Sequence, residues 1–180
     1  MDNLMRELYL IQNFKLRLCV ARYLDTVPDY FFTVGASSTG KYHPQYTQGE
    51  GGLVRHTKAA VQIANMLLQL EQYDTLLIHR DEIISALIIH DTYKHGVEDT
   101  GHTVFEHPIL ASQKFREFAV GQECSAERID LICDLVKTHM GQWNKSNYSD
   151  VVLEKPVTAE QQFVHLCDYL ASRKTITIEV

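Results

Sequence analysis

The apolar positions of this chain recur at helical spacing along most of its length. Residues three or four positions apart share one face of a helix, whereas alternate residues share one face of a strand. The pattern predicts helices near residues 2–25, 53–72, 80–91, 108–119, 125–139 and 159–172. The sequence therefore predicts an all-α fold.

Three long segments lack the helical period, and they are residues 27–52, 92–106 and 140–157. The first carries Pro, Gly, Ser and Thr, which favours a loop with at most a short helical turn. Loops longer than about 12 residues inside a compact domain often have a functional role. The end "TITIEV" alternates like a strand but has no obvious partner strand, so we interpret it as a tail or an oligomer contact.

Composition and charge narrow the class of protein. The chain has 180 residues, of which 45% are hydrophobic, and no shift in composition divides it, so one globular domain is expected. The net charge of -6 argues against a broad basic surface for duplex DNA. Four scattered cysteines without a C-x-x-C pair disfavour disulfides and thiolate zinc sites. No apolar run is long enough to span a membrane, and we expect a cytoplasmic protein.

Histidines and aspartates fall on the inner faces or at the ends of five predicted helices. An inward histidine is usually a hydrogen-bonded core residue, but six such groups would each need a separate buried partner. A shared metal centre would satisfy all of them together. Imidazole and carboxylate ligands suit Mn, Fe, Co, Zn or Mg. The six candidate metal ligands are His56, His90, Asp91, His107, His139 and Asp168.

The order of four of these residues resembles a known signature. His56, the doublet His90-Asp91 and Asp168 are similar to the H…HD…D pattern of the HD-domain superfamily of metal-dependent phosphohydrolases. The resemblance implies a single HD-domain helical bundle over residues 1–180, with a core at about 35–172 and long active-site loops. It also implies that the four residues hold one metal and that Asp91 bridges to a second.

Two further histidines indicate a binuclear centre. His107 and His139 lie between the doublet and the final aspartate, where binuclear members of this superfamily place two additional histidine ligands. His107 directly precedes Pro108, which suits the first position of a helix. Two divalent transition-metal ions are therefore the expected cofactors.

Lys94 and the loop before His56 are the candidates for contact with the substrate. Lys94 matches the lysine of the "HDxxK" form of phosphodiesterase-like branches of this superfamily. This resemblance implies a contact with a phosphate oxygen; a solvated loop lysine is the alternative. The segment "KYHPQYTQGEGGLVRHT" resembles one in HD-domain 3′–5′ exoribonucleases, and Gly51 and Gly52 allow a tight turn into the His56 helix. Candidate substrate-binding residues are Ser37, Ser38, Lys41, Tyr42 and His43, with ordinary loop solvation as the alternative.

The remaining histidines receive no ligand role. His95 and His102 lie in the loop after the doublet and are candidates to line the pocket or to protonate a leaving group. His165 precedes Asp168 by three residues and is expected to support it, whereas His79 is expected at the surface.

The predicted function is metal-dependent hydrolysis of a phosphodiester in a nucleotide or a single-stranded nucleic acid. Asp91 and Lys94 are the expected catalytic residues, and water activated by two metals is the nucleophile. Two alternatives stay open. The ligand pattern also resembles that of HD-type mixed-valent diiron oxygenases, so such an oxygenase is the first alternative. The second is a non-catalytic HD module that senses a nucleotide. An oligomer is also compatible with the sequence.

Overall fold

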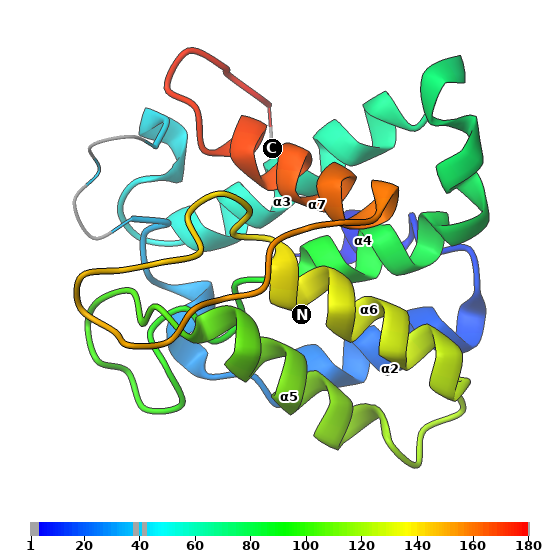
Figure 1. The fold of residues 1–180 in the computed structure, drawn as a ribbon, viewed down its shortest axis with the longest axis horizontal. Coiled ribbons are helices and arrows are strands. Elements are labelled where there is room, and N and C mark those ends of the chain that lie inside the picture. Colours follow the sequence, from blue (N-terminus) through cyan, green and yellow to red (C-terminus); the bar gives the residue numbers. More distant parts are fainter. Residues whose placement is uncertain (1–3, 38–39, 41–42, 180) are drawn as a thin grey trace.

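The computed structural model describes residues 4–37, 40 and 43–179, and all regular elements in this part of the chain are helices. Six described helices have ten or more residues, and five of them form most of a bundle: α2 (Phe14–Leu24), α3 (Gly52–Leu67), α5 (His107–Ala119), α6 (Ala126–Thr138) and α7 (Ala159–Ala171). They surround α4 (Arg80–Ile89). Figure 1 shows α3 beside α7 on one side of α4, and α5 beside α6 on the other. The all-α prediction is confirmed.

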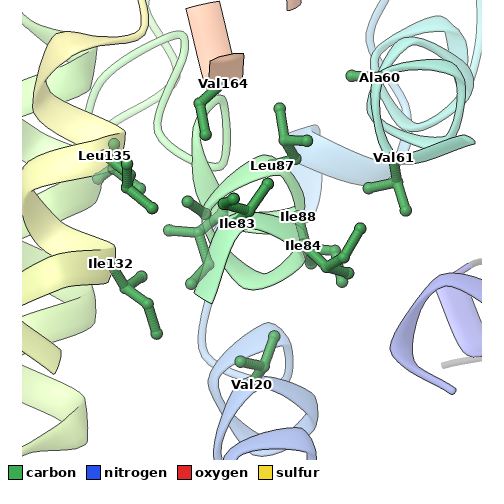
Figure 2. Close-up of a cluster of buried hydrophobic side chains, with 14 of the residues drawn as sticks. Val20, Ala60, Val61, Ile83, Ile84, Leu87, Ile88, Ile132, Leu135 and Val164 are labelled. Atoms are coloured by element: carbon green, nitrogen blue, oxygen red, sulfur yellow. The ribbon is translucent and has the colours of Figure 1, made fainter. Parts of the chain in front are cut away.

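Helix α4 is the centre of the hydrophobic core. Every residue from Glu82 to Ile89 is buried. A helix that is apolar around most of its circumference must be covered on all sides. Figure 2 shows Leu87 and Ile84 of this helix among side chains from α2, α3, α6 and α7. Because the core fixes α4 so completely, the residues that follow Ile89 are held in a defined position.

The predicted helix at 2–25 is wrong as a single element. The chain forms the short α1 (Met5–Leu8), breaks, and begins α2 at Phe14. Asn13 causes the new start, because its side chain accepts a hydrogen bond from Leu16 N at 2.9 Å. The Asp81 carboxylate of α4 accepts hydrogen bonds from Gln12 N and Asn13 N, at 2.8 and 2.7 Å. A tertiary contact therefore stabilises the break.

The other predicted helices agree with the structure to within a few residues. Helix α3 ends at Leu67, and residues Glu71–His79 form a separate 3₁₀ helix before α4. A capping box begins α7, in which Thr158 Oγ1 accepts from Gln161 N and Gln161 Oε1 accepts from Thr158 N. The described part of "TITIEV" forms no strand, and its Ile178 packs partly against the core.

The long loops gather at one end of the bundle (Figure 1). The first contains 3₁₀ turns at Asp29–Phe32 and Gln45–Thr47 and then turns sharply into α3. Gly51 has a φ of 69°, and a side chain at Gly52 would overlap the Thr47 carbonyl group. The predicted tight turn before His56 is confirmed.

No helix in the described ranges is long and apolar enough to cross a membrane.

Candidate metal centre

Six polar side chains converge at the end of the bundle that carries the long loops. They form two groups of three, each with one ligand atom per residue and with these atoms within 4.8 Å of one another. His56, His90 and Asp168 form the first group, and Asp91, His107 and His139 form the second. Five of the six residues are buried, and Asp168 is partly exposed. The structure thus brings together all six candidate ligands from the sequence.

Asp91 lies between the two groups. Its Oδ2 atom is 3.5 Å from His90 Nε2 and 3.8 Å from His56 Nε2. Its Oδ1 atom is 3.1 Å from His107 Nε2 and 3.8 Å from His139 Nε2. Each carboxylate oxygen therefore faces a different pair of histidines.

Backbone carbonyl groups orient three of the histidine rings. The Nδ1 atoms of His90, His107 and His139 each lie 2.7 Å from the carbonyl oxygen three residues earlier. A carbonyl oxygen only accepts hydrogen bonds, so Nδ1 carries a proton, and a ring that is neutral has its lone pair on Nε2. Such contacts orient metal-binding histidines. The sequence placed each ring at a helix end, and the backbone there supplies the acceptor.

The ligand atoms of the second group lie close together, and Asp91 Oδ1 is buried without a hydrogen-bond partner in the described part of the chain. His107 Nε2 and His139 Nε2 are 3.2 Å apart, and Asp91 Oδ1 is 3.1 Å from His107 Nε2. Burial, together with His90 and His107, lowers the pKa of His139 to about 3, so this ring is neutral near pH 7. A buried carboxylate oxygen without a hydrogen-bond partner, beside a neutral imidazole, is unfavourable without a cation. The donor set therefore fits a divalent metal ion.

The first group also consists of two imidazole rings and one carboxylate in close contact. His56 Nε2 lies 2.9 Å from Asp168 Oδ1, and His90 Nε2 lies 3.4 Å from His56 Nε2 and 3.7 Å from Asp168 Oδ1. Burial alone would raise the pKa of Asp168, but its contacts with His56 and His90 hold that pKa well below the usual range. Two imidazoles and one ionised carboxylate could hold a second divalent ion.

Lys94 is buried beside this centre. Its Nζ atom lies 2.5 Å from Asp91 Oδ2, and its side chain is 11% exposed. Burial alone would raise the pKa of Asp91, but the charge of Lys94 and the neighbouring His90 and His107 rings hold that pKa well below the usual range. The alternative of a solvated loop lysine is therefore wrong.

A comparison with protein families agrees with this geometry. The model of the HD domain family matches residues 53–173, which is about two thirds of the chain. The chain belongs to the HD-domain family. HD domains are generally metal-dependent phosphohydrolases that bind divalent metals, and the matched segment contains both groups of three. No curated protein and no solved structure shows significant similarity to this chain.

A cavity of about 210 Å³ opens onto the centre of this HD domain. Asp91, Lys94 and Asp168 lie in its wall. Of the predicted substrate-binding residues, Ser37 and His43 also line it, whereas Ser38, Lys41 and Tyr42 lie outside the described residues. Burial, with the neighbouring His56 and Lys94, lowers the pKa of His43 to about 4. His43 is thus neutral near pH 7.

The other histidines of this HD domain have separate roles. His95 bonds to Asp99 through Nδ1 at 2.8 Å and stacks on Tyr30, with ring centroids 5.1 Å apart. His102 is exposed and lines a neighbouring hollow. Neither residue lines the cavity described above, which corrects the expectation from their sequence position.

His165 supports a different ligand from the one expected. Its Nδ1 atom lies 2.7 Å from the His139 carbonyl oxygen, so it holds the end of α6 in place. His79 is partly exposed and lies 4.0 Å from Glu160, near the surface as predicted.

Several residues of the cavity wall were not predicted from the sequence. Thr103, Met140, Trp143, Tyr169 and Arg173 all line it. Two signals were present in the sequence: Tyr169 directly follows Asp168, and Trp143 lies at the start of the loop that begins after His139. The spacing of the histidine ligands carried no information about these aromatic side chains.

Gly141 allows the turn between His139 and Trp143, and its replacement is expected to be destabilising. Its φ is 60°, and a Cβ atom would overlap the His165 ring. Gly141→Ala should cost about 1–2 kcal/mol for the left-handed backbone alone, with ring displacement in addition. Chemical denaturation would measure the loss. The same change in a His165→Ala background should cost less, because only the backbone term then remains; equal costs would contradict the proposed overlap.

Proposed function

We propose that this HD domain hydrolyses a phosphodiester in a nucleotide or a single-stranded nucleic acid, using two divalent metal ions. The position of Asp91 is the observation that carries the proposal. Each of its carboxylate oxygens faces a separate set of imidazole nitrogens, at distances between 3.1 and 3.8 Å. A carboxylate in this position is suited to bind two cations at once.

The chain supplies two sets of ligands for these ions. His56, His90 and Asp168 would hold one ion, His107 and His139 would hold the other, and Asp91 would contact both. Two ions in these positions would lower the pKa of a water molecule and neutralise charge on a phosphate. Mn, Fe, Co, Zn and Mg are all compatible with nitrogen and oxygen ligands.

Residues of the chain itself would orient the substrate. The Lys94 ammonium group lies in the cavity wall on the Oδ2 side of Asp91 and would bind a phosphate oxygen. Such a contact stabilises negative charge that develops during hydrolysis. Ser37 and the neutral His43, both from the first long loop, also line the cavity and are proposed to donate or accept hydrogen bonds. The same role is proposed for Ser38, Lys41 and Tyr42 from the sequence resemblance.

The number of bound metals provides a direct test. We expect about two divalent ions per chain after anaerobic reconstitution, measured by elemental analysis. The double change His107→Ala and His139→Ala should lower the content to about one, because both nitrogen ligands of the second ion are lost. His95→Ala is the matched control and should not change the content, since that ring bonds to Asp99. A wild-type content of one or less that the double change leaves unaltered would contradict a binuclear centre.

Anaerobic hydrolysis separates the proposal from its alternatives. The metal-loaded protein should hydrolyse bis(p-nitrophenyl) phosphate in the absence of oxygen. An oxygenase would instead require oxygen and a mixed-valent iron pair. A non-catalytic sensing domain would bind a nucleotide without turnover with any of the candidate metals.

A further inference from the structure

An aromatic pair and an arginine stand in the wall of the same cavity. The rings of Trp143 and Tyr169 are nearly parallel, with an interplanar angle of 16° and centroids 5.6 Å apart. The guanidinium carbon of Arg173 lies 4.3 Å from the Tyr169 centroid and 5.9 Å from the Trp143 centroid. Trp143 is 42% exposed, so part of its ring is accessible to a ligand. We call Trp143, Tyr169 and Arg173 the aromatic rim.

The chain holds Trp143 in a defined position. Its backbone N donates to Met140 O at 3.1 Å, which closes the turn after α6. The His165 ring packs against the indole, with centroids 5.8 Å apart, and also bonds to the His139 carbonyl oxygen. The same imidazole therefore contacts both the aromatic rim and the backbone of a proposed metal ligand. This arrangement fixes the indole relative to the metal centre.

The positive charge of Arg173 is available to bind an anionic ligand. Its guanidinium group donates to Ser172 Oγ at 2.8 Å, and this acceptor is neutral. Within the described part of the chain, no carboxylate lies within ion-pair distance of it. An arginine that lies on an aromatic ring and lacks a carboxylate partner is well suited to bind a phosphate.

The size of the cavity places limits on what it can enclose. Pockets that enclose drug-sized ligands usually measure about 300–1,000 Å³, whereas this cavity measures about 210 Å³. A phosphate and part of a sugar can enter it. A nucleobase attached to that sugar would remain at the mouth, where the exposed indole offers a flat surface. Stacking of bases on aromatic side chains is a common mode of nucleotide recognition.

We propose that the aromatic rim is a subsite for a nucleotide unit, in which the base stacks on Trp143 and Arg173 binds a phosphate. This inference rests on the proposed phosphohydrolase function and names the residues that recognise the base of its substrate. The substrate carries a purine or pyrimidine next to the phosphate that is cleaved. A simple sugar phosphate or an alkyl phosphodiester lacks the group that the rim recognises.

Trp143 is the sole tryptophan of the chain, so intrinsic tryptophan fluorescence reports on the rim alone. The metal-loaded wild-type protein is titrated with adenosine 5′-monophosphate and, separately, with ribose 5-phosphate. We expect saturable quenching by the nucleotide and little change with the sugar phosphate, because only the nucleotide carries a base. Equal responses to the two ligands, or no response to either, would overturn the subsite.

Substrate preference gives a second readout. The substrates are thymidine 5′-(p-nitrophenyl phosphate) and methyl p-nitrophenyl phosphate, which share a leaving group. Trp143→Ala should lower kcat/KM for the thymidine ester by about five- to a hundredfold, the usual range for one stacked base, and should leave the methyl ester nearly unchanged. Trp143→Phe should recover part of the loss. An equal loss with both substrates would show that the indole has only a structural role.

A matched control exists elsewhere on the molecule. Arg17 lies over the rings of Tyr9 and Phe14, at 5.1 and 5.6 Å, and none of the three residues lines the cavity. Phe14→Ala removes an exposed ring from this similar arrangement and should not change the preference between substrates. Hydrolysis of both esters without nucleotide quenching would refute the subsite alone. Nucleotide quenching without hydrolysis of either ester would refute the phosphohydrolase function and retain the subsite.

Discussion

Asp91→Asn is expected to lower the rate of phosphodiester hydrolysis by about a thousandfold or more, which corresponds to about 4 kcal/mol of activation free energy. The asparagine side chain has nearly the same shape, but it loses the negative charge and replaces one carboxylate oxygen with an amide group. Both oxygens of Asp91 face imidazole nitrogens, so no orientation of the amide retains both oxygen ligands. Steady-state kinetics with bis(p-nitrophenyl) phosphate would measure the loss.

Asp99→Asn is the matched control for this substitution. Asp99 lies in the same loop but bonds to His95 and Gly101 at the surface, and it does not line the cavity. It should retain the wild-type rate and metal content. If Asp91→Asn retained a tenth of the activity, the shared ligand of the two ions would have to be another residue.

Lys94→Ala is expected to lower kcat by about tenfold to a thousandfold while the metal content stays unchanged. The Lys94 ammonium is a charged group in the cavity wall, and it is absent from both proposed sets of metal ligands. An interaction made mainly in the transition state affects kcat, whereas one made equally in the bound substrate affects KM. Steady-state kinetics and elemental analysis of the same preparation would separate these effects.

Two other lysines complete this test. Lys114 pairs with Glu117 on α5 at 2.8 Å, outside the cavity, and Lys114→Ala should leave both kinetic parameters unchanged. The sequence assigns Lys41 to substrate binding. Lys41→Ala should therefore raise KM and leave kcat near the wild-type value. A raised KM with normal kcat for Lys94→Ala would reduce its role to attraction of the anionic substrate. A loss of metal would instead indicate that Lys94 acts by positioning Asp91.

Local sequence signals were sufficient for most helices because their apolar period matches their burial. Helix α7 begins at a capping box and α5 begins at His107-Pro108, both of which can be recognised without a structure. The first predicted helix was wrong because its apolar period does not match the structure. Its apolar period continues across residues 9–13, but Asn13 and the distant Asp81 stabilise a break there. A contact between residues nearly 70 positions apart cannot be recognised from a local sequence pattern.

The candidate ligands could be listed from the sequence because each occupies a core-facing position that would be costly for an isolated polar group. The family resemblance also implied their grouping, with Asp91 between two metal sites. Spacing on separate helices does not reveal which oxygen of Asp91 faces which imidazole, because that depends on how α4 packs against α3, α5, α6 and α7. The same limit explains why His165 was assigned to Asp168, although it bonds to the His139 carbonyl oxygen.

The sequence by itself determined the all-α class, the order of the helices, the family signature and the six side chains that need a shared polar environment. Only the tertiary structure decided that Lys94 is buried against Asp91, that His95 and His102 do not line the cavity, and that Trp143, Tyr169 and Arg173 lie in its wall. The physical reason is the range of the interactions. Helical periodicity and capping act within a few residues, whereas the cavity is formed by loops and helix ends that meet only when the buried α4 brings the surrounding helices together.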